Sequence, residues 1–94
     1  MFEYFEILGF TAGIFTTMAF IPQILKIMKT KKTDDFSYLW LIMTMTGVTL
    51  WFFYGLIINS QPVVIFNFLS LIFVCFIIIF KFIVSYVSVK SKTI

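Results

Sequence analysis

The stretch TTMAFIPQILKIMKTKKTDD, residues 16–35, begins as an apolar helix, contains a Pro-Gln pair and ends in a cluster of charges. Pro22 has no backbone N–H to donate, and in a continuous helix its ring collides with the carbonyl of Met18. We therefore expect the helix to bend or loosen at this point. Gln23, the next residue, can satisfy a freed backbone group or a group on a neighbouring chain. The bend is either a static kink or a hinge, and the rest of the sequence is needed to interpret it.

The composition of the chain is that of a membrane protein. Of its 94 residues, 62% are hydrophobic and only 12% are charged, whereas soluble domains carry roughly 25% charged residues. A soluble core of this size could not hide 14 Phe side chains. With one cysteine and no histidine, neither an intrachain disulfide nor a metal site is expected. The net charge of +3 lies beside apolar runs, which fits orientation in a membrane better than nucleic-acid binding.

Charged residues divide the chain into apolar runs of two lengths. Between Glu6 and Lys26 lie 19 residues without a formal charge, and between Asp35 and Lys81 lie 45. A helix needs about 20 residues to cross a bilayer, so the first run predicts one span and the second run predicts two. The polar cluster NSQP, residues 59–62, is the best candidate for the turn between the last two spans.

The expected fold is a single all-α transmembrane domain, residues 1–94, with helices near 5–28, 37–58 and 62–86. A cleaved signal peptide is not expected, because the first residues, MFEYFE, are acidic and no small-residue cleavage site follows the apolar run. Lysines gather beside the first loop and the last helix, whereas the N-terminus and the NSQP turn hold no lysine or arginine. The positive-inside rule therefore predicts a multi-pass protein of the cell (inner) membrane, with the N-terminus outside and the C-terminus in the cytoplasm.

Polar and aromatic side chains recur within the predicted spans. Asn67 lies several residues inside the third helix, where an unpaired amide is costly. Trp51 and Tyr54 share one face of the second helix with Gly47. An indole and an amide at similar depth can recognise a sugar, because the ring packs on its CH groups and the amide bonds its hydroxyls. Alternatively, Asn67 bonds a neighbouring helix, and the two rings belong to an interfacial aromatic belt.

Small residues indicate where helices approach one another closely. The first helix carries GFTAG, in which Gly9 and Gly13 are four residues apart. This spacing allows close helix packing, although the pattern is common by chance in apolar helices. We expect Gly9, Gly13 and Gly47 to lie at helix contacts.

Three segments together resemble the bacterial SemiSWEET sugar transporters of the PQ-loop family. FTTMAFIPQILKIMKTKKTDDFS, residues 15–37, resembles their first helix and loop. GVTLWFFYG, residues 47–55, and NFLSLIF, residues 67–73, resemble their second and third helices. The Pro-Gln pair alone is a weak signal. Its combination with the lysine-rich loop, Gly-x-x-x-Trp-x-x-Tyr-Gly and the asparagine 13 residues after that tyrosine is a strong one.

The resemblance implies a parallel homodimer, in which three helices from each protomer form a six-helix bundle around a sugar path. It implies that Trp51 and Asn67 bind the substrate and that Tyr54 belongs to the outer gate. It also implies an inner gate and hinge made of Pro22, Gln23, Trp40, Met43 and Thr44.

The chain departs from the family pattern at both gates. Family members carry Arg four residues and Asp six residues after the gate tyrosine, and this chain has Ile58 and Ser60 at those positions. We therefore expect the outer end to close through aromatic and apolar contacts alone. Thr44 stands where an aromatic residue is common in the family.

The function that the resemblance implies is facilitated transport of a small neutral mono- or disaccharide by alternating access. No Asp, Glu or His falls within the long apolar runs, so proton coupling is not expected. No phosphate-binding loop, cofactor site, nucleophile–base pair or carboxylate dyad can be assembled, so an enzyme is not expected either. The expected partners are the sugar, a second copy and the lipid bilayer. The alternatives are a carrier of another small neutral solute and a structural or accessory membrane protein.

Overall fold

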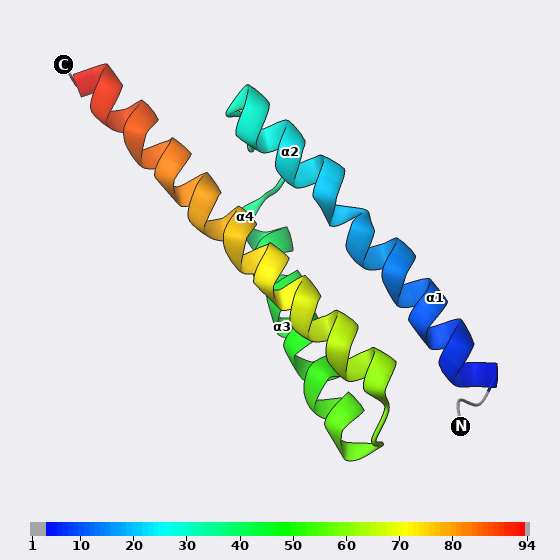
Figure 1. Ribbon diagram of the computed structural model, residues 1–94. Coiled ribbons are helices and arrows are strands. Elements are labelled where there is room, and N and C mark those ends of the chain that lie inside the picture. Colours follow the sequence, from blue (N-terminus) through cyan, green and yellow to red (C-terminus); the bar gives the residue numbers. More distant parts are fainter. Residues whose placement is uncertain (1–3, 94) are drawn as a thin grey trace.

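The computed structural model describes residues 4–93, with side chains from Tyr4 to Ser91, and its secondary structure is entirely helical in that range. The elements are α1 (Tyr4–Met18), α2 (Phe20–Thr30), α3 (Tyr38–Ile57) and α4 (Gln61–Thr93) (Figure 1). Within the described range, three helical stretches are long and apolar enough to cross a membrane, because α1 and α2 count as one. The prediction of a three-helix, all-α membrane protein is confirmed. The ends of the predicted domain, 1–3 and 94, lie outside the described residues.

The helix boundaries differ from those predicted in two places. The first helix, predicted over 5–28, is interrupted at Ala19, and the last, predicted to end near 86, continues to Thr93. The end of α4 was misjudged because serines and lysines replace apolar residues there. This change in composition marks the edge of the membrane rather than the end of the helix, since no Gly or Pro interrupts residues 83–93.

The interruption of the first span lies where Pro22 acts on the backbone. Met18, four residues before the proline, is the last residue of α1, and α2 begins at Phe20. Ala19 between them keeps helical dihedral angles (φ −63°, ψ −23°), and its N–H still donates to the carbonyl of Phe15 at 3.1 Å. The helix is therefore loosened rather than broken, and α2 continues in nearly the direction of α1 (Figure 1).

The three spans form a flat layer with α4 in the middle. α4 packs along α3 on one side and against α1 and α2 on the other, and none of the described backbone of α1 or α2 packs on α3. The principal extents are 61 × 23 × 15 Å. The protomer is therefore long and wider than it is thick, with its spans side by side. A layer of this kind has two faces and no interior of its own.

The turn from α3 to α4 is built around Asn59, whose φ of 58° lies in the left-handed region. The N–H of Ser60 donates to the carbonyl of Gly55 at 2.9 Å. The N–H of Asn59 donates to the carbonyl of Leu56 at 3.4 Å. These two bonds make a Schellman motif, which satisfies carbonyls that the helix end would otherwise leave unpaired. The NSQP segment thus ends one helix and, through Pro62 in the first turn of α4, begins the next.

The buried core is small and lies near the loop between α2 and α3. Ile27 of α2, Leu41 of α3, and Val74 and Ile77 of α4 are each at most 2% exposed and form one cluster. All three spans contribute to this cluster, so it holds the layer together at the end that carries the loop.

At the opposite end, two glycines allow α1 to approach α4. A Cβ at Gly9 would lie 3.0 Å from the ring of Pro62, and a Cβ at Gly13 would overlap the ring of Phe66. Gly47 differs from the prediction made for it, because a Cβ there would meet nothing within 4 Å. The helix contact expected at Gly47 is therefore absent from the protomer, where that side of α3 faces open space.

The substitution Gly13→Ala tests the contact between α1 and α4. The added methyl group would displace the Phe66 ring, and overpacking of this kind costs about 1–3 kcal/mol. We expect a lower Tm for the purified protein, followed in detergent by size-exclusion chromatography after heating. Gly47→Ala is the matched control, since it makes the same change inside a helix where space is open, and it should leave the Tm unchanged or slightly raised. Equal losses in the two variants would contradict the contact.

Candidate functional site

One stripe of α3 has no partner within the protomer. Residues spaced four and three apart share this face of the helix. Trp51 and Tyr54 are 55% and 49% exposed, and Trp40, at the start of the helix, is 45% exposed. From the loop end to the α3–α4 turn, the α3 stripe consists of Trp40, Thr44, Gly47, Trp51, Tyr54 and Ile58.

Trp51 and Tyr54 form an aromatic pair on the α3 stripe. Their ring centroids are 5.4 Å apart and the rings meet edge to face at 88°. With Leu50 they line an open groove of about 220 Å³. Gly47, one turn away, adds no side chain that would narrow this groove. The indole can therefore pack against one face of a ligand, but the protomer covers the ligand on one side only.

Asn67 lies in a second groove, between α1 and α4. Its Nδ2 donates to the carbonyl of Val63 at 2.8 Å, which leaves the amide oxygen able to accept a bond from a ligand. Gly13 and Thr16 of α1 and Ser70 of α4 also line this groove, whose volume is about 170 Å³. Trp51 does not line it. The two predicted substrate-binding residues thus lie in separate grooves of the protomer.

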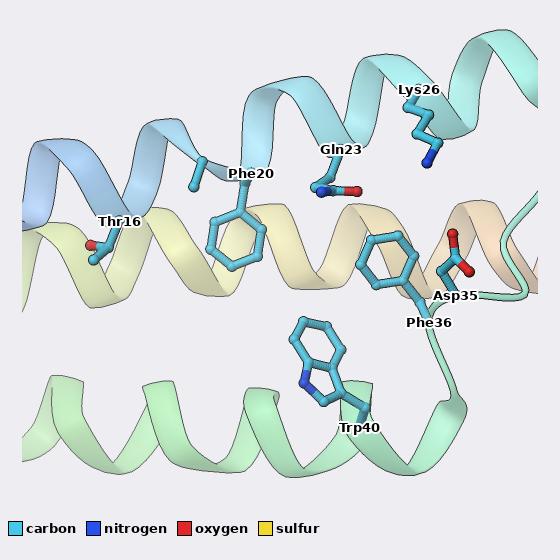
Figure 2. Close-up of a pocket in the computed structure, with 8 residues that line it drawn as sticks. Thr16, Phe20, Gln23, Lys26, Asp35, Phe36 and Trp40 are labelled. Atoms are coloured by element: carbon cyan, nitrogen blue, oxygen red, sulfur yellow. The ribbon is translucent and has the colours of Figure 1, made fainter.

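A third groove, of about 480 Å³, lies at the end of the molecule that carries the α2–α3 loop. Figure 2 shows Phe20 and Gln23 projecting from α2 on one side, and Phe36 and Trp40 on the other. The rings of Phe36 and Trp40 are 5.6 Å apart. Thr16 lines both this groove and the Asn67 groove, so the two adjoin on α1 and form a continuous surface.

The predicted inner-gate residues divide into two groups. Gln23 and Trp40 line the 480 Å³ groove, whereas Pro22, Met43 and Thr44 do not. Pro22 acts on the backbone next to the groove rather than through its side chain. Met43 lies one turn after Trp40 and is 65% exposed, so it stands beside the groove on the open face of α3.

Sequence reasoning missed two charged residues of this groove, Lys26 and Asp35. In Figure 2 the Lys26 ammonium and the Asp35 carboxylate point toward each other near the end of the groove. Both had been interpreted only as part of the charged segment that orients the protein. The spacing contains a signal, because Lys26 follows Gln23 by three residues and therefore shares its helix face.

Three contacts hold the α2–α3 loop beside this groove. The Ser37 hydroxyl accepts the N–H of Trp40 at 3.0 Å and so caps the start of α3. On α4, Lys81 donates its Nζ to the carbonyl of Thr33 at 3.0 Å, and the same nitrogen lies 5.0 Å from the centre of the Tyr38 ring. Thr33 is 4% exposed, so the loop is pressed onto α4.

Apart from Lys26 and Asp35 at the loop end, the side chains that line these grooves suit a neutral, polar solute. They offer aromatic rings, an amide and hydroxyl groups, which can pack against CH groups and exchange hydrogen bonds with hydroxyls. Across residues 4–93, so far as the structure describes them, no three His, Cys, Asp or Glu side chains come together in a way that could hold a metal ion.

Comparison with known proteins gives a consistent result. The PQ loop repeat family model matches residues 4–65. The chain is 39% identical over 76 residues to the sugar transporter SemiSWEET of Leptospira biflexa, which covers 81% of this chain and 89% of that protein. It resembles the crystal structure of a bacterial homologue of SWEET transporters, with a TM-score of 0.83 and 44% identity over 87% of this chain and 99% of the other. It also resembles SemiSWEET in the inward-open conformation, with a TM-score of 0.73 and 28% identity over 98% and 95%.

The substitution Lys81→Met tests the anchoring of the loop. It removes the bond to the Thr33 carbonyl and the contact with Tyr38 but keeps an apolar stem. Since a hydrogen bond to a charged group contributes about 1.5–3 kcal/mol, we expect trypsin to cleave after Lys31 and Lys32 roughly tenfold faster. Mass spectrometry of the fragments gives the rate. Lys90→Met, on the same helix but away from the loop contact, is the control and should not change it; an unchanged rate in Lys81→Met would contradict the anchoring.

Proposed function

Because this chain belongs to the PQ-loop family and to its SemiSWEET group, we propose that it is a facilitative transporter that moves a small neutral sugar across the membrane by alternating access. The observation that carries the proposal is the α3 stripe, whose aromatic rings lie about half exposed on a face with no partner. In a transporter of this family, we expect such an uncovered face to line the path that the substrate takes. The proposed activity is transport, and we assign no catalytic step to any residue.

A second copy completes the proposed path. Two protomers inserted in the same direction are related by a two-fold axis along the membrane normal and give a six-helix bundle. Their open faces then meet, and the two Trp51 rings and two Asn67 amides surround one solute. The separation of Trp51 from Asn67 within one protomer supports this arrangement, because each groove is covered on one side only.

The proposed gates lie at the two ends of the α3 stripe. Tyr54 belongs to the outer gate, where Ile58 and Ser60 leave no charged latch. We assign Gln23, Trp40, Met43 and Thr44 to the inner gate, and we propose that Phe20 and Phe36, which line the same groove as Trp40, take part in it.

The proposed hinge of the inner gate is the junction of α1 and α2 at Pro22. Ala19 keeps helical angles there, so a change of bend need not unfold the span. Nearby Thr17 is 7% exposed and its hydroxyl has no hydrogen-bond partner. Such a buried hydroxyl costs about 1–3 kcal/mol. A change of bend at the junction that gave this hydroxyl a partner would recover that energy.

The proposed orientation puts the N-terminus and the α3–α4 turn outside the cell and the C-terminus in the cytoplasm, in the cell (inner) membrane. The segments that carry the lysines, namely α2, the α2–α3 loop and the last turns of α4, lie at one end of the molecule, and α1 starts at the other (Figure 1). The positive-inside rule assigns the first end to the cytoplasm.

The substitutions Trp51→Ala and Asn67→Ala test the proposed site. In proteoliposomes loaded with labelled mono- and disaccharides, each substitution should reduce sugar flux by about tenfold or more. The reason is that both protomers of the dimer lose the same side chain from the binding surface. Phe53→Ala is the matched control, since Phe53 is also 55% exposed but lies on the opposite side of α3. It should leave the flux nearly unchanged. Flux that survives both test substitutions would show that the path lies elsewhere.

The same vesicles separate the proposal from its alternatives. The wild-type protein should equalise sugar concentrations across the membrane and stop there. Accumulation driven by an imposed proton gradient would overturn downhill transport. A carrier of another neutral solute would pass that solute but none of the sugars, and an accessory protein would pass neither.

The substitution Pro22→Ala tests the hinge. Restoring the backbone N–H allows a continuous helix through residue 19, so the inner gate should change its bend more slowly. We expect a several-fold slower sugar exchange with little change in the Kd of sugar binding, measured by tracer exchange and by tryptophan fluorescence. Parallel losses in binding and exchange would indicate a purely structural proline.

A further inference from the structure

A fourth groove lies apart from the proposed path, where α4 runs on beyond the end of α2 (Figure 1). Its volume is about 600 Å³, larger than that of each groove described above. One wall is the side chain of Lys31, from the loop. The other wall belongs to α4 and consists of Phe80, Ile83, Val84, Val87, Ser88 and Ser91.

This groove continues the face of α4 that the first span covers. Phe73 of α4 stacks on Phe20 of α2, with their ring centroids 5.7 Å apart. Two turns further along the same face of α4, Phe80 lies under Lys31, whose Nζ is 5.4 Å from the ring centroid. α2 ends at Thr30, so the following turns of the same face have no helix beside them. The groove is therefore an apolar helix face that loses its protein partner at Lys31.

The depth of the groove corresponds to the boundary between acyl chains and headgroups. The candidate span Gln61–Ser91 has 31 residues. At 1.5 Å per residue it is about 46 Å long, close to the roughly 40–45 Å of a bilayer with its headgroup layers. The groove occupies the last third of this length. Val87 is nevertheless 58% exposed, so apolar surface lies at a level where phosphates and water are found.

The cation at this groove comes from the residue that ends α2. Lys31 adopts φ 58° at the end of α2, and its N–H donates to the carbonyl of Ile27 at 2.8 Å. Its ammonium group lies over the Phe80 ring, beside an apolar wall that also carries two serine hydroxyls. Lys29 and Lys32 lie next to it in the sequence and add positive charge at the same end. A ligand that matches the groove must combine an acyl chain, a negative charge and hydrogen-bonding groups.

We propose that this groove binds an anionic phospholipid of the inner leaflet. Its acyl and glycerol part packs on Phe80, Ile83, Val84 and Val87, its phosphate pairs with Lys31, and its headgroup hydroxyls bond Ser88 and Ser91. Phosphatidylglycerol has all three features. The groove lies on the α2 side of α4, away from the α3 stripe, so the lipid and the second copy do not compete for one surface.

The substitution Lys31→Gln, with Lys29→Gln as its matched control, tests the proposal. Phosphatidylglycerol or phosphatidylcholine is added to the purified full-length protein, and retained lipid is counted by native mass spectrometry. We expect the wild type to retain phosphatidylglycerol about fivefold better than phosphatidylcholine. Lys31→Gln should abolish this preference, whereas Lys29→Gln, which removes the same charge outside the groove, should keep it. Equal retention of the two lipids by the wild type, or equal losses in the two variants, would overturn the proposal.

A second variant tests the apolar wall without changing charge. Val87→Trp fills the groove from an exposed position of α4 and should also reduce phosphatidylglycerol retention, with no change in Tm. Undiminished retention in this variant would show that the lipid binds by charge alone, outside the groove, and would also overturn the proposal.

Discussion

A protomer of three spans side by side, with α4 in the middle, cannot surround a polar solute, and the rest of the structure follows from this constraint. The backbones of the first span and of α3 do not pack on each other within the described chain, and the groove that they line together is open on one side. In a lipid environment the polar side chains of the spans need hydrogen-bond partners, and most of those named here bond to the backbone of their own helix. The hydroxyls of Thr11, Thr46 and Thr49, for example, donate to carbonyls four residues earlier. What remains unused is the open face with its aromatic rings and the free half of the Asn67 amide. These groups become an interior only when a second layer covers them.

The chemistry of that interior is uncharged along most of its length. Rings and amides bind sugars without fixing a countercharge, which suits downhill movement because a weakly held solute can leave on either side. Among the described residues that line its grooves, Lys26 and Asp35 bring charge at the loop end. The end at the α3–α4 turn is different in kind. There Ser60 contributes its backbone N–H to the helix cap, and Ile58 contributes apolar surface.

The sequence predicted the parts of this structure that depend on local chemistry. The lengths of the apolar runs predicted the three spans, and the NSQP cluster predicted the reversal at Asn59. The missing N–H of Pro22 predicted the loosened helix at Ala19. The sequence-based predictions failed where contacts with neighbouring helices decide the environment of a residue. Gly47 was expected to pack but faces open space, because packing depends on the position of α4 and not on the residue itself. The residue types of Trp51 and Asn67 gave no sign that they occupy separate grooves.

The first span is attached to α4 at both of its ends. Near one end Gly9 and Gly13 seat α1 on Pro62 and Phe66, and at the other Lys81 ties down the loop that follows α2. The loosened junction lies between these two fixed points. A helix that is attached at both ends and loosened between them bends at the loosened point and cannot pivot as a rigid body about one end. Motion in such a span would be concentrated near Ala19. The α2 segment that carries Gln23 could then change its bend relative to α1 while Gly9 and Gly13 keep α1 seated on α4.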